Sequence, residues 1–344
     1  MRAVLLERHG GPEVLTLTTV PDPAPPPGWV AVRVRACALN HLDLWARRGL
    51  PGVRFPLPLI LGNDVAGVVE ETGAGVDWVQ PGAEVVLAPG FGCGHCEACL
   101  AGDDNLCRRY AILGSTVHGG YAERVVAPAA NCLPRPAGLS WAEAASLPLV
   151  FLTAWNMLVH RARVRAGEDV LVLAAGSGVG IAAIQIAKLR GARVIAAAST
   201  AAKLERARAL GADETINYAQ ADFAAEVRRL TGKKGVEVVV EHTGQETWGR
   251  SLLAAARGGR IVTCGATSGY EAVTDLRHVF SRQLQILGSN MGRKASLHEI
   301  FRWVERGRLR PVVDRVLPLE RVREAHEVLE RRAAFGKVVL EPPA

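Results

Sequence analysis

Residues 170–191 read VLVLAAGSGVGIAAIQIAKLRG, and this stretch decides the fold. Its first five residues, 170–174, are apolar and predict a short strand that is buried on both faces. A turn of small residues follows. From Val179 to Leu189 the apolar residues then recur at helical spacing, until Gly191 ends the run. A strand, a glycine turn and a helix in this order begin a βαβ unit.

The turn predicts a binding site for a dinucleotide. Small residues let backbone N–H groups and the positive N-terminus of the helix approach a diphosphate closely. The fit to G-x-G-x-x-G is loose, because Ala175 and Ser177 stand at the first two glycine positions, and an ordinary tight turn is the alternative. The predicted cofactor-binding residues of the turn are Gly176, Ser177, Gly178, Val179 and Gly180.

The end of the second apolar strand, 192–199, bears on which cofactor is bound. A dinucleotide fold places an acid here, about 20 residues past the glycines, to bind the ribose 2′-hydroxyl. The sequence has Ser199 and Thr200 instead, with Lys203 close by, so no carboxylate repels a 2′-phosphate. The pattern favours NADPH over NADH, although Lys203 by itself fits a solvated surface lysine equally well.

Further strand-like segments alternate with helical patterns through the middle of the chain. Strands are predicted at 214–218, 236–241, 260–264 and 284–288. Alternating strands and helices predict an α/β fold with a doubly wound parallel sheet. Dinucleotides bind where such strands end, which makes four further residues candidates for cofactor contacts: Gly265, Ala266, Ser289 and Asn290.

Length and composition set the outer limits. The chain has 344 residues, enough for two domains with a core each, and its 49% hydrophobic and 22% charged residues are typical of a soluble globular protein. We find neither an apolar run of about 18 residues nor the apolar core of a signal peptide, so a cytoplasmic protein without membrane contact is expected. The net charge of +7 comes without a basic run and with only 5% aromatic residues, which argues against nucleic acid as a partner.

The chain divides into a β-rich part and a βαβ part. Short strands are predicted at 2–6, 15–20, 30–36, 65–69 and 84–87, with one short helix near 42–47. Residues 142–160 predict a helical passage, and the last stretch has short strands that suit the β-rich part. We therefore expect one domain from residues 1–150, completed by 296–344, and a second domain from 151–295.

Four of the seven cysteines lie in one loop, 91–110, which reads FGCGHCEACLAGDDNLCRRY. The C-x2-C-x2-C-x7-C spacing is formed by Cys93, Cys96, Cys99 and Cys107. Four thiolates at such spacing can close around one tetrahedral Zn²⁺ and leave no open position, so the predicted zinc is structural. An iron–sulfur cluster or four thiols without metal are the alternatives, and His95 is interpreted as a loop residue. The odd number of cysteines argues against a disulfide framework.

The order of these parts resembles the medium-chain dehydrogenase/reductase superfamily, which includes zinc alcohol dehydrogenases and quinone oxidoreductases. The resemblance covers nearly the whole chain. It implies a GroES-like catalytic domain, a Rossmann domain that binds a nicotinamide cofactor, and an active site in the cleft between them. It also implies a homodimer or homotetramer, for which 282–291 is the candidate edge strand.

Zinc alcohol dehydrogenases use a second, catalytic zinc, and the matching segments here lack its usual ligands. Asn40 stands where that family has a cysteine, Asn63 stands where it has a histidine, and 147–153 contains no Cys, Asp, Glu or His. Asparagine is a poor zinc ligand, so the catalytic zinc is expected to be absent. The alternative is an unconventional site built from Cys37, His41 and Asp64.

The same segments resemble the quinone oxidoreductase and enoyl reductase branch, which works without a catalytic metal and usually prefers NADPH. The motifs that carry this resemblance are N-x-x-D at 40–43 and G-x-D-x-A-G at 62–67. The cofactor contacts that it implies are Ser199, Lys203 and Tyr218 at the 2′-phosphate, Thr153 at the nicotinamide ring and Lys337 at the diphosphate. The four-cysteine loop is a departure, because most quinone oxidoreductases lack it.

These observations predict an enzyme that transfers a hydride from NADPH to a quinone or an α,β-unsaturated carbonyl. Without a Lewis acid, the developing negative charge must be delocalised or meet hydrogen-bond donors, which favours a conjugated substrate. Asn40 is the hypothetical donor, while Asp43 and Asp64 hold the site's geometry or serve only as caps. The competing functions are zinc-dependent alcohol dehydrogenation with atypical ligands and a non-enzymatic protein that binds the cofactor.

Overall fold

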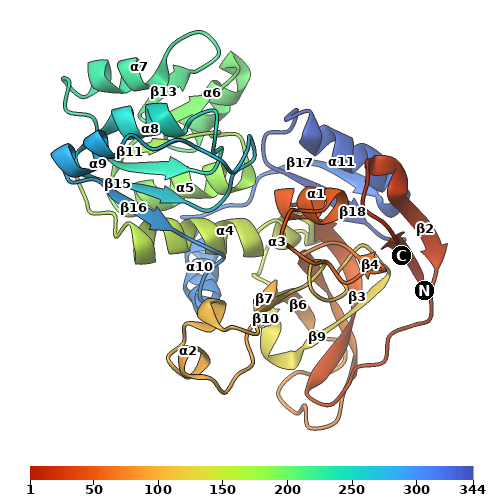
Figure 1. Cartoon of the computed structure of the whole chain (residues 1–344). Helices are drawn as coiled ribbons and strands as arrows, with labels where there is room; N and C mark the ends of the chain where they lie inside the picture. Colours follow the sequence, from red (N-terminus) through yellow and green to blue (C-terminus); the bar gives the residue numbers. More distant parts are fainter. Residues whose placement is uncertain (344) are drawn as a thin grey trace. The chain divides into compact units, whose positions relative to one another are not determined.

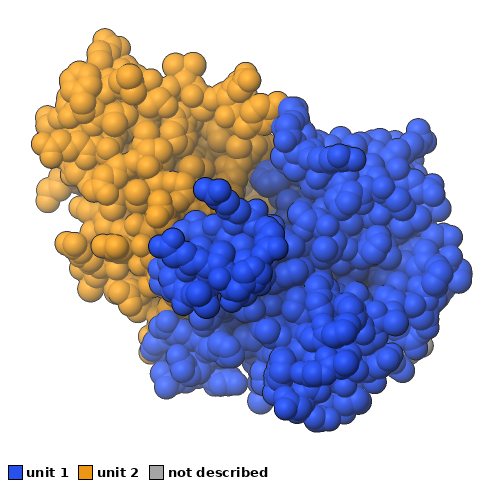
Figure 2. Space-filling model, turned by 60° about the horizontal axis from the view of Figure 1, so that its bottom comes forward, with its two compact units in different colours: residues 1–149, 293–306, 310–344 blue, residues 150–292, 307–309 orange. Residues whose placement is uncertain are grey.

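The computed structural model describes residues 1–343, and the chain forms two compact units. Unit 1 comprises Met1–Leu149, Arg293–Arg306 and Arg310–Ala344, and unit 2 comprises Val150–Gly292 and Gly307–Leu309 (Figure 2). Each unit has its own sheet and its own hydrophobic core.

Unit 2 is built on a six-stranded sheet whose neighbouring strands are all parallel, in the order β13-β12-β11-β14-β15-β16 (Figure 1). Its strands are β11 (Asp169–Val172), β12 (Arg193–Ala198), β13 (Glu214–Asn217), β14 (Val236–Glu241), β15 (Ala255–Thr263) and β16 (Gln285–Gly288). Its helices are α5 (Gly178–Leu189), α6 (Ala201–Ala209), α7 (Phe223–Leu230), α8 (Trp248–Ala254) and α9 (Leu276–Arg282). The predicted doubly wound parallel sheet is confirmed.

The apolar run after residue 169 forms a central strand because both of its faces are covered. Leu171 and Leu173 join a core cluster that includes Phe223 from α7 and Leu252 from α8. Val172, on the other face of the sheet, is fully buried as well, and α5 packs against β11 and β12. A strand buried on both faces reads as a continuous apolar run rather than an alternating one.

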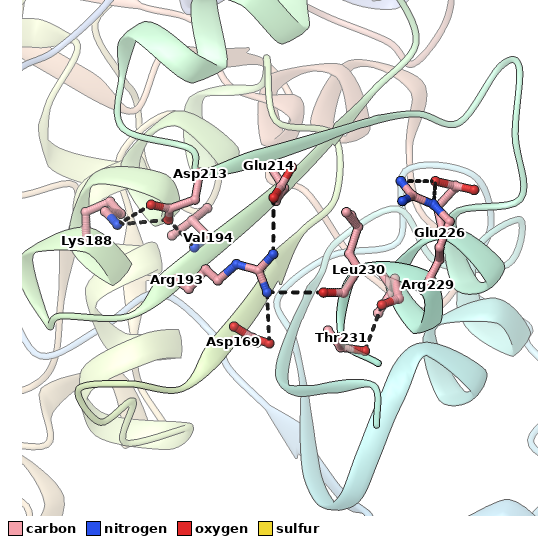
Figure 3. Close-up of polar contacts among 11 residues, drawn as sticks. Asp169, Lys188, Arg193, Val194, Asp213, Glu214, Glu226, Arg229, Leu230 and Thr231 are labelled. Carbon is pink, nitrogen blue, oxygen red and sulfur yellow. Dashed lines mark hydrogen bonds and ion pairs between the residues drawn. The ribbon is translucent and has the colours of Figure 1, made fainter. Parts of the chain in front are cut away.

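One arginine joins the amino ends of three neighbouring strands in unit 2 (Figure 3). The guanidinium of Arg193, at the start of β12, donates to Asp169 at 3.5 Å, to Glu214 at 3.2 Å and to the Leu230 carbonyl at 3.4 Å. Asp169 begins β11 and Glu214 begins β13. These charges lie at the amino ends of the strands, and the carboxyl ends of the same strands carry the predicted cofactor residues.

Unit 1 contains a seven-stranded sheet in the order β10-β6-β5-β3-β18-β17, with β9 also paired to β3. Its strands are β3 (Trp29–Ala38), β5 (Asp64–Thr72), β6 (Glu84–Leu87), β9 (Arg124–Pro128), β10 (Cys132–Pro134), β17 (Val313–Pro318) and β18 (Lys337–Glu341). Smaller sheets pair β1 (Arg2–Leu6) with β2 (Leu15–Thr19) and β4 (Leu59–Ile60), and β7 (Gly90–Phe91) with β8 (Ala111–Ile112). The helices are α1 (His41–Arg48), α2 (Glu97–Leu100), α3 (Trp141–Ala145), α10 (Ser296–Glu305) and α11 (Val322–Glu330).

The C-terminal strand β18 pairs antiparallel with β3, which places Val339 opposite Ala38 and Leu340 opposite Cys37. Because of this register, Lys337 enters the sheet close to the segment that follows β3 and begins α1. Residues nearly three hundred positions apart in sequence thereby meet, as the 297-residue separation of Lys337 from Asn40 shows.

One helical stretch qualifies the expectation about membrane spans. Trp141–Arg161, which includes α3 and α4 (Pro148–Trp155), has 21 residues, and its most apolar 18-residue window has a mean hydropathy of 1.4, so it has the length and composition of a span. However, 89% of its most apolar window is buried inside the protein. Burial of this kind is typical of a core helix.

The glycine at the start of α5 is required by the close approach of helix and strand. A Cβ on Gly180 would meet the backbone of Ala174 and lie 2.9 Å from the Cα of Ala175. Gly180→Ala should therefore lower the free energy of unfolding by about 1–3 kcal/mol, measured by denaturant titration. Gly249→Ala in α8 is the matched control, because a Cβ there meets nothing within 4 Å. Equal effects of the two substitutions would contradict the packing argument.

Candidate active site

Asp43 makes hydrogen bonds to both motif segments of unit 1, 40–43 and 62–67. Asn40 is extended at the N-cap of α1 and puts its backbone N–H 2.7 Å from the Asp43 carboxylate. The other oxygen of Asp43 accepts a hydrogen bond of 3.0 Å from the backbone N–H of Gly62. Asp43 is fully buried, and its contacts are those of a cap that also fixes a neighbouring loop.

Asp64 lies at the centre of the site, and both of its oxygens are engaged. Oδ1 accepts a hydrogen bond of 2.8 Å from the backbone N–H of Leu149, in the first turn of α4. Oδ2 accepts from the side-chain amide of Asn40 at 2.9 Å and from the ammonium of Lys337 at 3.0 Å. Asp64 is fully buried and Asn40 is 5% exposed, so these bonds are largely shielded from water.

Lys337 lies beside Asp64 and Asn40. Its ammonium is 3.0 Å from the Asp64 carboxylate and 2.5 Å from the Asn40 carbonyl oxygen, and the contact with the cofactor diphosphate that the family resemblance implies stays a prediction. Its side chain is 4% exposed. A buried ammonium needs a carboxylate and hydrogen-bond acceptors, and in unit 1 these come from Asp64 and Asn40.

The surroundings of Asp43 disfavour its ionised form. Burial raises the pKa of the Asp43 carboxyl to about 7, although the N–H groups of Asn40 and Gly62 and the Lys337 ammonium act in the opposite direction. Burial also holds the pKa values of the neighbouring Cys37 thiol and Tyr121 phenol well above their usual range, so both are neutral near pH 7. Asp64 and Lys337 form a buried ion pair of 3.0 Å beside these groups.

Asn63, at the position where zinc alcohol dehydrogenases have a histidine, is turned to a structural contact. Its side-chain nitrogen donates to the Leu113 carbonyl at 2.5 Å, and its buried Oδ1 has no hydrogen-bond partner. The proposed unconventional zinc ligands do not converge either. Among residues 1–343, the four loop cysteines are the only group of three or more His, Cys, Asp or Glu side chains placed to share a metal.

The cysteine loop has the geometry that one zinc requires. The Sγ atoms of Cys93, Cys96, Cys99 and Cys107 lie within 4.8 Å of one another. Tetrahedral coordination with Zn–S bonds of about 2.3 Å requires sulfurs about 3.8 Å apart, which lies within this limit. The Cys107 sulfur also accepts backbone N–H groups from Cys93 at 3.4 Å and Arg109 at 3.3 Å. Four thiolates leave no open position, so this set fits a structural zinc.

The pKa values of two thiols of this loop are shifted toward the thiolate form, which binds zinc. The backbone N–H of His95 lowers the pKa of Cys93 to about 5, and the backbone N–H of Cys93 lowers that of Cys107. Burial raises the pKa of Cys99 to about 11, so its thiolate depends on the charge of a bound metal. The ring of His95 contacts the guanidinium of Arg109 at 2.5 Å, in agreement with its interpretation as a loop residue.

The glycine turn of unit 2 has the predicted form. Ser177 caps α5 and accepts the N–H of Gly180 at 3.0 Å, while Ala174 takes a positive φ of 43° to bring the chain from strand to helix. The remaining N–H groups of the first helical turn have no partner within the helix. Gly176, Gly178 and Val179 thus lie at a helix N-terminus, which is an anion-binding arrangement.

The predicted 2′-phosphate residues come together at the ends of two neighbouring strands. Ala198 on β12 pairs with Asn217 on β13, so Ser199 and Tyr218 follow side by side, and the Tyr218 N–H donates to the Ala198 carbonyl at 3.1 Å. Lys203 lies in the first turn of α6, where its backbone N–H bonds to the Thr200 hydroxyl at 3.3 Å. No carboxylate stands at Ser199 or Thr200.

The other predicted cofactor residues of unit 2 are spread over two places. Gly265 and Ala266 follow β15, and Ser289 and Asn290 follow β16, all at the carboxyl edge of the sheet. The Ser289 hydroxyl accepts a hydrogen bond of 2.8 Å from Asn156. Thr153 lies outside the sheet, on α4, where it is 5% exposed.

Glu241 and His242, at the end of β14, are not among the residues predicted for the site. Glu241 is fully buried and accepts hydrogen bonds from the backbone N–H groups of Thr243 and Gly244 and from the Thr247 and Ser251 hydroxyls. His242 is 7% exposed, burial lowers its pKa, and its Nε2 has no partner. The available signal was the E-H-T-G sequence that begins with Glu241, the last residue of the predicted strand 236–241.

Comparison with known proteins identifies the family. The model of the alcohol dehydrogenase GroES-like domain matches residues 26–137, and that of the zinc-binding dehydrogenase matches residues 178–306. The chain is 31% identical to the quinone oxidoreductase of Rattus norvegicus over 350 residues, which cover 99% of this chain and 97% of that protein. The chain therefore belongs to the medium-chain dehydrogenase/reductase superfamily and is an oxidoreductase that uses a nicotinamide cofactor.

Two solved structures extend the comparison. The crystal structure of an NAD-dependent alcohol dehydrogenase has a TM-score of 0.96 and 57% sequence identity, with 99% of both chains covered. A crotonyl-CoA carboxylase/reductase, AntE, in complex with NADP has a TM-score of 0.91 and 27% identity, with 99% of this chain and 94% of that chain covered. The fold is thus shared by proteins described with different substrates and different cofactors.

The raised pKa of Asp43 predicts a particular dependence of stability on pH. Between its unfolded pKa of about 3.9 and its folded pKa of about 7, the folded chain binds a proton that the unfolded chain has lost. The contribution of Asp43 to the free energy of unfolding therefore falls as pH rises through this interval, by about 1–4 kcal/mol, and is constant above it.

Thermal unfolding of the wild type and of Asp43→Asn from pH 4 to 8 measures this contribution. We expect the advantage of the wild type to be largest near pH 4 and to shrink towards pH 7. Asp77→Asn, at an exposed aspartate, is the control and should change little with pH. A difference between wild type and Asp43→Asn that is flat or grows over this range would show that Asp43 is ionised in the folded protein.

The cysteine loop predicts one zinc per chain in protein purified without added metal. Cys93→Ser and Cys107→Ser should each reduce the zinc content to near zero and lower the melting temperature, because the loop loses its cross-link. Cys132→Ser, outside the cluster, should keep the zinc. Elemental analysis makes the measurement. A wild type without zinc would contradict the predicted structural zinc site, and two zincs per chain would contradict an active site without zinc.

Proposed function

We propose that this protein transfers a hydride from NADPH to a quinone or an α,β-unsaturated carbonyl, without a catalytic zinc. The observation that carries the proposal is the cluster of Asn40, Asp64 and Lys337 in unit 1. Its carboxylate already binds an ammonium and two N–H donors, and its cation is a lysine. A carboxylate saturated in this way is a poor candidate for a metal ligand.

The choice of substrate class follows from where charge develops. Adding a hydride to a simple ketone concentrates negative charge on one oxygen, for which a Lewis acid supplies several kcal/mol of stabilisation. In an enone or a quinone the charge spreads over the conjugated system, so hydrogen bonds from the protein suffice. A site with asparagine, aspartate and lysine side chains therefore suits a conjugated acceptor.

The proposed cofactor is NADPH, bound along the carboxyl edge of the unit 2 sheet. When bound, the nicotinamide would supply the hydride. The turn at 174–180 would hold the diphosphate, and Ser199, Lys203 and Tyr218 would hold the 2′-phosphate. The absence of an acid at Ser199 supports NADPH, whereas the similarity to an NAD-dependent enzyme keeps NADH as the alternative. Thr153, Gly265, Ala266, Ser289 and Asn290 remain proposed contacts.

Zinc-dependent alcohol dehydrogenation is the second candidate. It is favoured by the 57% identity to a structure described as an alcohol dehydrogenase and by the match to the zinc-binding dehydrogenase model. The ligand set argues against it, because no second group of potential ligands converges among residues 1–343. This second candidate function predicts two zincs per chain, one of them catalytic, and oxidation of alcohols.

We propose further that two copies of the chain associate through β16. This strand pairs only with β15, so its other edge is open among the described residues. Leu276 and Phe280, on the helix α9 that precedes β16 in the chain, and Ile286 on β16 itself are exposed. An open strand edge with apolar neighbours is suited to pairing with a second strand, and the mass of the protein in solution is the test.

The experiment that tests the proposed function is a turnover assay with purified protein. We expect NADPH to be oxidised in the presence of 2-cyclohexen-1-one or 1,4-naphthoquinone, with NADH at least about tenfold less effective in kcat/KM. Primary alcohols with NAD⁺ or NADP⁺ are the comparison substrates. Alcohol oxidation that is abolished by a zinc chelator, with no reduction of either conjugated acceptor, would overturn the proposal in favour of the second candidate.

A further inference from the structure

The proposed reaction needs a hydrogen-bond donor for the oxygen that becomes negative. Asn40, the donor predicted from the sequence, uses its N–H groups within the protein. The side-chain nitrogen of Asn40 donates to Asp64 at 2.9 Å and lies 3.5 Å from the Ala38 carbonyl. Its oxygen accepts from Lys337. Both ends of the Asn40 amide are thus occupied within the protein, so this side chain is a positioning group.

Lys337 offers what Asn40 lacks. An ammonium has three N–H donors, and among residues 1–343 only two side chains, Asn40 and Asp64, accept from it. Its side chain is almost fully buried, so little water competes for the third donor. A charged donor in such surroundings forms hydrogen bonds about twice as strong as a neutral one does.

The protein holds this ammonium in one place. Asp64, which pairs with it, is itself anchored by the Leu149 N–H at the start of α4. Asn40, which accepts from it, is anchored through its backbone by Asp43. A donor fixed before the substrate arrives needs no reorganisation when charge develops, and such preorganised donors are the largest source of stabilisation in comparable reactions.

We propose that Lys337 donates a hydrogen bond to the carbonyl oxygen of the substrate and stabilises the enolate that forms there; this rests on the proposed function. The hydride adds to the β carbon, the C=C electron pair moves to make the enolate, and the dihydronicotinamide is oxidised. A proton from water then adds to the α carbon. Lys337 keeps its proton throughout, and Asn40 and Asp64 position it.

The test must separate the ammonium from the ion pair it belongs to. Lys337→Met alone leaves Asp64 buried without its cation, which can unfold the protein. Asp64→Asn also leaves one charge unpaired, but the new amide oxygen and that of Asn40 still accept from the ammonium. We therefore compare it with Asp64→Asn/Lys337→Met, which differs from it only in the ammonium. Circular dichroism and the melting temperature establish that each variant is folded. Lys294→Met removes another part-buried lysine, bonded to Asn131, and is the matched control.

The first readout is turnover of 2-cyclohexen-1-one together with the dissociation constant of NADPH. We expect the double variant to be about 100-fold or more slower in kcat than Asp64→Asn, with an unchanged NADPH dissociation constant. In the same Asp64→Asn background, Lys337→Arg should recover part of the rate that the double variant loses. Lys294→Met should stay within about threefold of wild type. Equal rates for Asp64→Asn and the double variant, or a loss confined to NADPH affinity, would overturn the proposal.

The second readout needs no turnover. 4-Nitrophenol carries an oxygen that becomes negative on ionisation and changes its absorption, so it reports an ammonium beside its oxygen. Bound to Asp64→Asn, the dye should have a lower pKa than it has free in solution, and bound to the double variant it should not. If the wild type reduces neither conjugated acceptor but the dye still responds to Lys337, the proposed function fails and the donor site stands. If the conjugated acceptors are reduced, but neither the rate nor the pKa of the dye changes when Lys337 is replaced, only the role of Lys337 as donor is wrong.

Discussion

The buried ion pair between Lys337 and Asp64 is the interaction on which the candidate site depends. Its two residues are 273 positions apart in sequence and lie on β18 and at the start of β5. Removing one member would leave the other charged in a medium that solvates it poorly, at a cost of about 3–5 kcal/mol. The pair therefore makes the C-terminal strand part of the site and fixes where the positive charge lies.

Hydrogen bonds from backbone N–H groups to the Asp43 side chain fix the loops around this pair. Asp43 holds the backbone of Asn40 and Gly62, so the two loops that carry Asn40 and Asp64 are set relative to each other. Gly62 has a φ of 99°, and a side chain there would collide with Cys37 and Tyr121. The geometry of the site is thus a property of tight packing as much as of its charges.

In unit 2 the residues proposed to bind the cofactor follow the ends of the strands. In a parallel sheet every strand finishes at the same edge, so the residues that follow β11, β12, β13, β15 and β16 are collected there without contacts between distant side chains. The charges that join the strands' amino ends, such as Arg193 with Asp169 and Glu214, lie away from that edge (Figure 3). The carboxyl edge, where the cofactor is proposed to bind, carries small residues, hydroxyl groups and backbone N–H groups, together with the buried Glu241 and His242 at the end of β14.

Local patterns in the sequence determined the parallel sheet, the glycine turn and the cysteine loop. Each depends on residues close in the chain: an apolar run, small residues before a helix, or thiols a few positions apart. The role of Lys337 was decided only by the tertiary structure, because the pairing of β18 with β3 brings its ammonium to Asn40 and Asp64. The partnerless Nε2 of His242 and the raised pKa of Asp43 likewise follow from burial, which depends on what the rest of the chain packs around them.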